Sequence, residues 1–154
     1  MRDGFRTIVR LPVAPKTLYR AWLNSREHSA MTGAEATASS RVGASFTAWD
    51  GYVRGKNLRL KPYWCIVQSW RTSEFPRTAP DSQIELCIHP SGKTGSKLVF
   101  MHTKLTTPQI SQYRSGWRMY YFVPMKKYFA AKKLKTAAKR RPRRRTVRRA
   151  ARRR

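Results

Sequence analysis

The chain has 154 residues, and its 34 Lys and Arg against 7 Asp and Glu give a formal net charge of +27. This length suits one ordinary domain and leaves no room for a second of full size. No run of about 18 apolar residues is present to cross a membrane, and the first residues lack the apolar block of a signal peptide. We therefore expect a cytoplasmic protein whose two cysteines, Cys65 and Cys87, stay reduced.

The positive charge is concentrated towards the C-terminus. From Met125 onward the chain has 16 Lys or Arg and no acidic residue, whereas residues 1–124 have 18 basic and 7 acidic residues. A segment of such charge density repels itself and lacks the apolar surface for packing, which is typical of disorder. The sequence predicts one domain over residues 1–130 and a polybasic, disordered tail over residues 131–154.

The N-terminal part predicts one strand followed by two short helices. Residues 5–11 alternate between apolar and polar side chains, as in a strand with one buried face. Pro15 suits the first position of a helix, where its missing N–H costs nothing, and apolar side chains follow it at helical spacing. Ser25 is placed to cap a second helix that Gly33 ends.

From residue 36 to residue 107 the periodicity becomes that of strands. Short runs rich in Val, Ile, Thr, Phe and Trp are separated by turn residues, as in a consecutive antiparallel meander. Asp50-Gly51 predicts a two-residue hairpin turn, and Gly55 within a strand predicts a bulge or a sharp bend. The predicted strands cover residues 36–40, 44–49, 52–60, 64–72, 83–89 and 97–105.

The last two predicted strands carry apolar side chains on one face, which needs a cover. Residues 116–129, GWRMYYFVPMKKYF, have aromatic side chains at helical spacing and supply that cover. Thr107 and Pro108 are placed to start the helix, and Pro124 predicts a bend within it or, alternatively, a break at Val123. These elements predict an α+β fold in which a curved antiparallel sheet of about seven strands wraps around a long C-terminal helix.

Three segments of the sequence resemble one known family. They are VAPKTLYRAWLNSREHSAMTGAEA, SFTAWDGYVRGKNLRLKPYWCIVQSWR and GWRMYYFVPMKKYF, and together they cover about residues 7–130. The chain resembles the helix-grip fold of the START-like (birch-pollen-allergen-like, SRPBCC) superfamily, and within it the homologues of the activator of the 90 kDa heat-shock chaperone ATPase. Where that family often has paired glycines before the third strand, this chain has Val42-Gly43-Ala44. The resemblance implies stimulation of a chaperone ATPase without assigning the contacts to particular residues.

The resemblance also implies a cavity between the sheet and the long helix. Ligand pockets are mostly apolar with a few polar anchors, but ordinary cores are apolar too. Tight packing and an open cavity for a small apolar ligand are therefore alternatives. The candidate lining residues are the aromatic side chains Trp22, Phe46, Trp49, Trp64, Trp70, Phe100, Trp117, Tyr120 and Tyr121.

Enzymatic chemistry finds little support in the sequence. His28, His89 and His102 are far apart, and His102, which shares a strand face with core residues, is expected to be a hydrogen-bonded structural side chain. No spacing of His, Cys and acidic residues matches a metal site, so we expect no metal, no cofactor and no catalytic set. The SGKTG segment at residues 91–95 lacks the first glycine of a phosphate-binding loop and falls in a predicted hairpin, which makes it a chance match.

The tail predicts binding to a polyanion such as nucleic acid. No aromatic residues interleave its arginines, so base stacking is not expected, and binding should be independent of sequence and weakened by salt. A tail that only improves solubility, or one drawn to acidic lipids, is the alternative. The predicted polyanion-binding residues are Lys132, Lys133, Lys135, Lys139, Arg140, Arg141, Arg143, Arg144, Arg145, Arg148, Arg149, Arg152, Arg153 and Arg154.

Taken together, these features predict a non-enzymatic START-like domain related to chaperone-ATPase activators. Its basic tail would bind nucleic acid or another polyanion without sequence specificity and could associate the protein with DNA. The alternative is a binding or carrier protein for a small apolar ligand held between the sheet and the helix. The expected partners are a chaperone, a polyanion and, in the alternative, that ligand.

Overall fold

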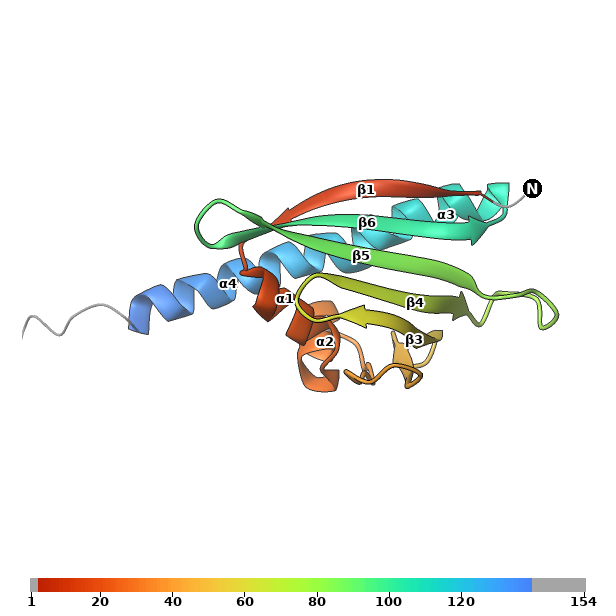
Figure 1. Ribbon diagram of the computed structural model, residues 1–154, viewed down its shortest axis with the longest axis horizontal. Helices are drawn as coiled ribbons and strands as arrows, with labels where there is room; N and C mark the ends of the chain where they lie inside the picture. The colour runs from red at the N-terminus through yellow and green to blue at the C-terminus, as the bar shows by residue number, and fades with distance from the viewer. Residues whose placement is uncertain (1–2, 140–154) are drawn as a thin grey trace, which may run out of the picture.

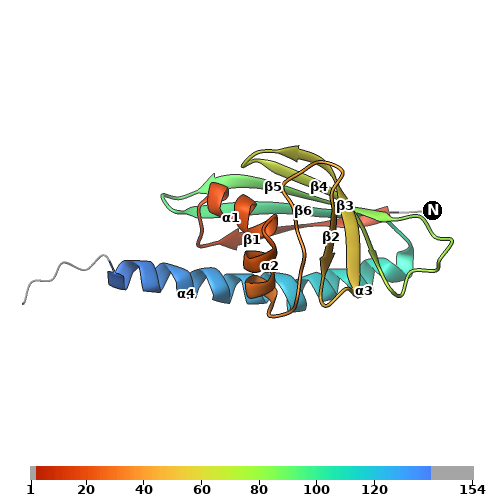
Figure 2. The same cartoon turned by 90° about the horizontal axis from the view of Figure 1, so that it is seen from below.

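The computed structural model describes residues 3–139 and shows an α+β fold (Figure 1). Six antiparallel strands form one sheet in the order β1-β6-β5-β4-β3-β2, and the long C-terminal helix lies along one face of it (Figure 2). The expected fold class is confirmed. The elements are β1 (Asp3–Leu11), α1 (Pro15–Trp22), α2 (Ser25–Thr32), β2 (Ser45–Ala48), β3 (Val53–Lys61), β4 (Cys65–Thr72), β5 (Ser82–Ser91), β6 (Gly95–Leu105), α3 (Thr107–Trp117), the π-helical turn η1 (Arg118–Phe122) and α4 (Val123–Lys139).

The sheet has six strands rather than about seven, because residues 36–40 do not form a ladder. Their backbone makes one isolated bridge, between Thr37 and Thr47. The amide of buried Asn57 donates instead to the carbonyls of Ser39 and Arg41, at 2.7 and 2.9 Å. A side chain on β3 thus satisfies carbonyl groups that a regular strand would pair with a neighbour.

The inner face of the sheet is the one predicted from alternation. Ile84 and Leu86 on β5 and Phe100 on β6 are almost fully buried, while the residues between them are partly exposed. The register pairs Leu86 with Phe100 across β5 and β6, so these side chains share one face. The long helix covers this face (Figure 2).

Two local predictions in the sheet differ from the structure. The turn between β2 and β3 spans four residues rather than two, and Trp49, Asp50 and Gly51 all have positive φ. The strand register runs through Gly55 without a bulge, and the irregularity in the pairing of β3 with β4 lies between Asn57 and Arg59 instead. A Cβ there would lie 1.8 Å from the carbonyl oxygen of Ser69 and 2.6 Å from a ring carbon of Phe46, so the close approach of these groups requires glycine.

The helix starts also differ slightly from prediction. The cap of α2 is Asn24 rather than Ser25, because the Asn24 side chain accepts the backbone N–H of Glu27 at 2.9 Å. The cap of α3 is Thr106 rather than Thr107, and its backbone N–H donates to the Gln109 side chain at 2.9 Å. Both caps are polar residues of the kind that helix N-termini favour, and each lies one position before the predicted cap.

The long helix does not break at Val123, since helical hydrogen bonding continues from η1 into α4. A π-helical turn, η1, precedes Pro124, and the N–H of Val123 donates to the carbonyl of Arg118, five residues earlier. Because proline has no N–H to donate to the preceding turn, the helical hydrogen-bond pattern must change near it. The wider π-helical turn provides that change. The helix therefore continues through α4.

The predicted domain end at residue 130 falls inside α4, which runs to Lys139. Met125 and Phe129 on α4 are buried in the core, so the first half of this helix belongs to the domain. Residues 131–139 are helical rather than disordered, because they extend a helix that the core already holds in place. Within residues 3–139, no helix combines the length and hydropathy that crossing a membrane needs.

Trp117 lies at the centre of the aromatic core. Its ring centroid is 4.3 Å from that of Phe100 on β6, 5.7 Å from Trp70 on β4 and 6.1 Å from Trp22 on α1. Its indole N–H donates to His102 at 2.9 Å. One side chain thus joins the long helix to the sheet and to the N-terminal helices.

Replacing Trp117 by Ala should reduce the free energy of unfolding by about 3 to 5 kcal/mol, because a large buried ring is lost and the cavity cannot close. Met119, two residues along the same helix, is 59% exposed, so Met119→Ala should change it by less than about 0.5 kcal/mol. Urea unfolding monitored by circular dichroism measures both. Equal stabilities of the two variants would contradict the central role of Trp117.

Candidate functional site

A pocket of about 480 Å³ lies at one end of the interface between the sheet and the long helix. The helix contributes one wall, and the turn between β2 and β3, the strand β4 and the residues after β4 contribute the other. Most of the lining is aromatic, which suits an apolar guest. The lining residues are Trp49, Tyr52, Val53, Trp70, Glu74, Gln112, Tyr113, Gly116, Trp117, Tyr120 and Tyr121.

An unusual backbone conformation places Trp49 at this pocket. Its φ is 52°, in the left-handed region that large side chains rarely adopt, and the ring packs edge-on against Tyr120 with centroids 5.5 Å apart. Strained backbone of this kind is concentrated at functional sites, where it aims a side chain. The turn therefore holds Trp49 against the helix at the cost of local strain.

The polar end of the pocket is built around Glu74. Its carboxylate accepts a hydrogen bond from the hydroxyl of Tyr52 at 2.5 Å and from the amide of Gln112 at 3.0 Å. Burial, together with this hydrogen bond to Glu74, raises the pKa of Tyr52 above its usual range, so that Tyr52 stays a neutral donor. The pocket thus combines an aromatic wall with one hydrogen-bonded carboxylate.

Two indole N–H groups beside the pocket lack an acceptor. Nε1 of Trp49 and Nε1 of Trp70 are both buried and make no hydrogen bond in the structure. A buried donor without an acceptor costs about 1 to 3 kcal/mol. A guest that placed an acceptor oxygen beside either ring would remove part of that cost.

The structure brings five of the nine predicted aromatic residues to the pocket and places four elsewhere. Trp22 and Phe100 lie in the packed core, and Phe46 packs against Gly55. Trp64 is 53% exposed in the turn between β3 and β4, because β4 begins after it, and its ring packs under the Lys61 side chain. The interior is therefore packed at its centre and hollow at one end. The five pocket residues are Trp49, Trp70, Trp117, Tyr120 and Tyr121.

Sequence reasoning missed the polar residues of the pocket. Glu74 follows β4 in a loop, and the apolar spacing assigns Gln112 to the polar face of the predicted helix, so no hydrophobic pattern pointed to them. The scarcity of acidic residues in this chain is a feature of the sequence that could have drawn attention to Glu74. Among residues 3–139, no group of three metal-ligating side chains lies in this pocket.

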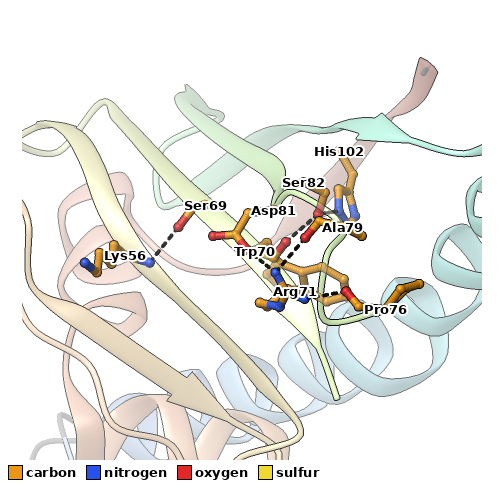
Figure 3. Close-up of polar contacts among 9 residues, drawn as sticks. All are labelled: Lys56, Ser69, Trp70, Arg71, Pro76, Ala79, Asp81, Ser82 and His102. Carbon is orange, nitrogen blue, oxygen red and sulfur yellow. Dashed lines mark hydrogen bonds and ion pairs between the residues drawn. The ribbon is translucent and has the colours of Figure 1, made fainter. Parts of the chain in front are cut away.

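His102 is a structural side chain, as predicted. The indole N–H of Trp117 donates to Nδ1, so the proton is on Nε2, which donates to the hydroxyl of Ser82 at 2.8 Å. Ser82 in turn donates to the carbonyl of Trp70 at 2.7 Å (Figure 3). Burial lowers the pKa of His102 to about 3, so the ring is neutral in the folded state.

His28 is a second buried histidine, which the sequence did not single out as structural. Its Nδ1–H donates to the carbonyl of Trp22 at 2.8 Å, and Nε2 accepts from the hydroxyl of Tyr121 at 2.9 Å. Burial lowers its pKa as well. One nitrogen of each buried histidine bonds the long helix, His28 at Tyr121 and His102 at Trp117, and the other bonds Trp22 or Ser82. All four ring nitrogens are hydrogen-bonded, which leaves neither histidine free to act as a base.

A second, open groove of about 840 Å³ follows β2, β3 and β4. Arg71 borders it and closes the loop between β4 and β5. Its guanidinium donates to Asp81 at 2.8 Å and to the carbonyls of Ala79 and Pro76 at 3.0 Å each (Figure 3). The groove has four cationic side chains and one acid, namely Arg54, Lys56, Arg71, Arg77 and Asp81.

The predicted polyanion-binding lysines lie on α4, which extends past the sheet (Figure 1). Lys132 forms a salt bridge with Glu27 of α2 at 3.0 Å, and Tyr128 hydrogen-bonds the same carboxylate. The hydrogen bond from Tyr128, followed by Lys132, lowers the pKa of Glu27. Lys133 donates to Thr94 at 3.4 Å. The predicted binding residues from Arg140 to Arg154 lie outside the described residues.

No family model matches the chain. It is 24% identical over 105 residues to the activator of 90 kDa heat shock protein ATPase homolog of Dictyostelium discoideum, and the alignment covers 68% of this chain. An HSP90 activator from Plasmodium falciparum shares the fold, with a TM-score of 0.68 and 16% identity over 79% of this chain and 91% of that one. The sequence is thus similar to that of an activator homologue of the 90 kDa heat-shock protein ATPase, and the fold is similar to that of a solved HSP90 activator.

A further activator homologue has a closely similar fold. The Aha1 of Colwellia psychrerythraea, solved as a dimer, matches with a TM-score of 0.69 and 13% identity, and the match covers 82% of this chain and 95% of that one. At these identities the likeness shows the fold alone. The chain spans about a quarter of the length of the Dictyostelium relative, 27%, so the match concerns one part of that activator homologue.

Acidification should destabilise the protein through His102. The unfolded chain binds a proton below the ordinary pKa of about 6.5, whereas the folded ring does so only near its pKa of about 3. The contribution of neutral His102 to the free energy of unfolding is therefore complete above pH 6.5. It is lost as the pH falls below that value, by about 1.4 kcal/mol per pH unit. Between pH 7.5 and pH 5 the His102→Gln variant should lose about 2 kcal/mol less than the wild type, measured by urea unfolding. Identical pH slopes would contradict the neutral, buried histidine.

Proposed function

We propose that this chain is a non-enzymatic regulator of a 90 kDa-type heat-shock chaperone and that its basic C-terminal arm binds a polyanion. The arm is defined as residues 131–154. The observation that carries the first part is the 105-residue similarity to a protein named for activating that ATPase. The structural use of both buried histidines supports a domain that binds rather than catalyses.

The extension of α4 supports the second part of the proposal. Beyond the last buried residue, Phe129, the described helix continues with four lysines and no acid, and ten arginines follow it in the sequence. The helix leaves the sheet behind at this end (Figure 1), so its cations face solvent rather than the core. Cations of this density bind phosphate backbones mainly by releasing counterions.

The experiment compares the full chain with a chain that ends at Lys139. This end point keeps the whole of α4, including the salt bridge between Lys132 and Glu27, and removes the ten arginines of residues 140–154. Both chains should change ATP turnover by the 90 kDa chaperone of the same cell. In titrations on duplex DNA, the log–log dependence of affinity on salt should be less steep for the shorter chain by up to about 9, because each released counterion contributes about 0.9.

The two halves of the proposal fail separately in this experiment. If neither chain alters ATP turnover while DNA binding depends on the arm, the regulator half is wrong. If both chains retain DNA equally at every salt concentration, the polyanion half is wrong. A heat-denatured sample of the full chain is the control for non-specific charge effects on the ATPase.

A second candidate function is binding of a small apolar ligand that carries an acceptor oxygen. The observation that favours it is the aromatic pocket with two indole donors, those of Trp49 and Trp70, that have no acceptor. An apolar body would fill the pocket, and the oxygen would satisfy a donor that is otherwise unpaired. Glu74 at the other end, already hydrogen-bonded by Tyr52 and Gln112, would disfavour an anionic guest.

Gly116 is a position at which a larger side chain would block this pocket selectively. It lines the pocket, and a Cβ at this position would meet no other atom within 4 Å. Gly116→Leu should therefore fill the pocket without a clash, lower the affinity for the neutral fluorophore prodan at least tenfold, and stabilise the helix by about 0.5 to 1 kcal/mol. Gly116→Ala is the matched control, with a similar gain in stability and little loss of binding. Equal prodan fluorescence titrations for wild type and Gly116→Leu would rule out the pocket as the binding site.

A further inference from the structure

Two cysteines that are far apart in the sequence face each other across β4 and β5. The register pairs Cys65 with Cys87, and their Sγ atoms are 2.8 Å apart without a disulfide. The adjacent N–H of Ile88 donates to the carbonyl of Trp64 at 2.8 Å. The cysteines therefore form a non-hydrogen-bonded pair, the arrangement in which cross-strand side chains approach most closely.

Glu85 joins the cysteines to form a group of three. It lies two residues before Cys87 on β5, so both side chains project from the same face of the strand. A carboxylate oxygen of Glu85 and the two Sγ atoms lie within 4.8 Å of one another, and all three residues are half-buried. The two salt bridges among residues 3–139 involve Asp81 and Glu27, and Glu85 takes part in neither, although the chain is strongly basic.

We propose that Cys65, Cys87 and Glu85 form a zinc-binding site on the outer face of the sheet. Two thiolates and a carboxylate are ligands that Zn²⁺ accepts in tetrahedral geometry, at about 2.3 Å for sulfur and about 2.0 to 2.2 Å for oxygen. Zn²⁺ replaces the two thiol protons, so that binding releases two protons and the carboxylate keeps its charge. The fourth position is left for water.

The geometry requires a small adjustment of the thiols. Tetrahedral ligation separates two sulfur ligands by about 3.8 Å, so the Sγ atoms must move apart by about 1 Å from their separation of 2.8 Å. Rotation about the Cα–Cβ bonds of two half-buried side chains supplies this movement without changing the strand register. The backbone of β4 and β5 already holds the ligands in place.

The ligand set selects zinc over the common hard cations. Mg²⁺ and Ca²⁺ bind through oxygen, and two of the three donor atoms here are sulfur. Met101 pairs with Glu85 across β5 and β6, so the neighbour of the site on the next strand is also a sulfur-containing side chain. The site is separate from the aromatic pocket, because Ile66 and Leu86, which alternate with these residues, point into the core.

The test uses the full chain, reduced and stripped of metal, with Cd²⁺ as a spectroscopic probe for Zn²⁺. Ultraviolet cadmium–thiolate charge-transfer absorption should saturate at one ion per chain, and Zn²⁺ should displace the ion and raise the melting temperature. Cys65→Ser and Cys87→Ser should each abolish this absorption at one equivalent, and Glu85→Gln should weaken affinity at least tenfold. Gln83→Ala, two residues from Glu85 on the same face, should bind like the wild type. Cys87→Ala replaces Cys87→Ser if the latter does not fold.

Several results would overturn this site. The reduced wild type could fail to take up Cd²⁺, a folded cysteine variant could retain the full absorption, or Glu85→Gln could bind with unchanged affinity. A freshly purified chain that lacks two hydrogens by mass, and that binds no metal after reduction, would show that the cysteines form a disulfide instead. Uptake by the wild type that is lost in both cysteine variants and weakened in Glu85→Gln establishes the site.

Discussion

The domain depends on the burial of Trp117 between the sheet and the N-terminal helices. A helix of this length with an aromatic stripe cannot remain exposed to water, and the sheet cannot leave its apolar face uncovered. Trp117 meets both needs at once, since its ring contacts Phe100 and Trp22 and its N–H is satisfied by His102. The hydrogen bond also fixes the direction of the ring, because only one edge of an indole can donate.

The π-helical turn that follows Trp117 explains why a packed core and a pocket exist side by side. The wider turn lets Tyr121 and Phe122, adjacent in the sequence, both be buried, while Met119 and Tyr120 remain exposed. On the other side of Trp117, Gly116 offers no side chain to fill the space next to Trp49 and Tyr52. The pocket is therefore the place where aromatic packing along the helix stops, and Pro124 is one reason that the helix is irregular there.

The fold class and the long C-terminal helix could be predicted from the sequence because both depend on the periodicity of apolar side chains. Alternation in β5 and the three- and four-residue spacing around Trp117 each identify a buried face without knowledge of the partner. The site was predicted less completely. Trp64 is a large aromatic residue of the kind found in cores, but β4 begins one residue after it, which leaves Trp64 exposed in a turn. Residue types define the ends of strands poorly. The polar end of the pocket depends on Glu74, which a loop brings to the helix, and hydrophobic periodicity carries no information about loops.

The pairing of Cys65 with Cys87 shows a different limit of sequence reasoning. It follows from the register of β4 and β5, which a shift of one residue would destroy by turning the side chains of one strand to the other face. The buried partners Ile66 and Leu86 hold that register, since a slipped strand would expose them. The packing of the inner face thus determines which side chains meet on the outer face, although no residue of the core takes part in that contact.

The same reasoning applies to the basic arm. Burial of Met125 and Phe129 fixes the rotation of α4, and the contacts of Glu27 with Tyr128 and Lys132 fix it further along. The lysines up to Lys139 therefore start the arm from a defined helical surface rather than from a flexible tail. A ligand pays less conformational entropy to bind groups whose positions are already set. For the proposed polyanion, the ordered lysines define where the contact begins on the domain. The core residues Met125 and Phe129 hold the helix that carries them, and Glu27 adds a contact beyond the core.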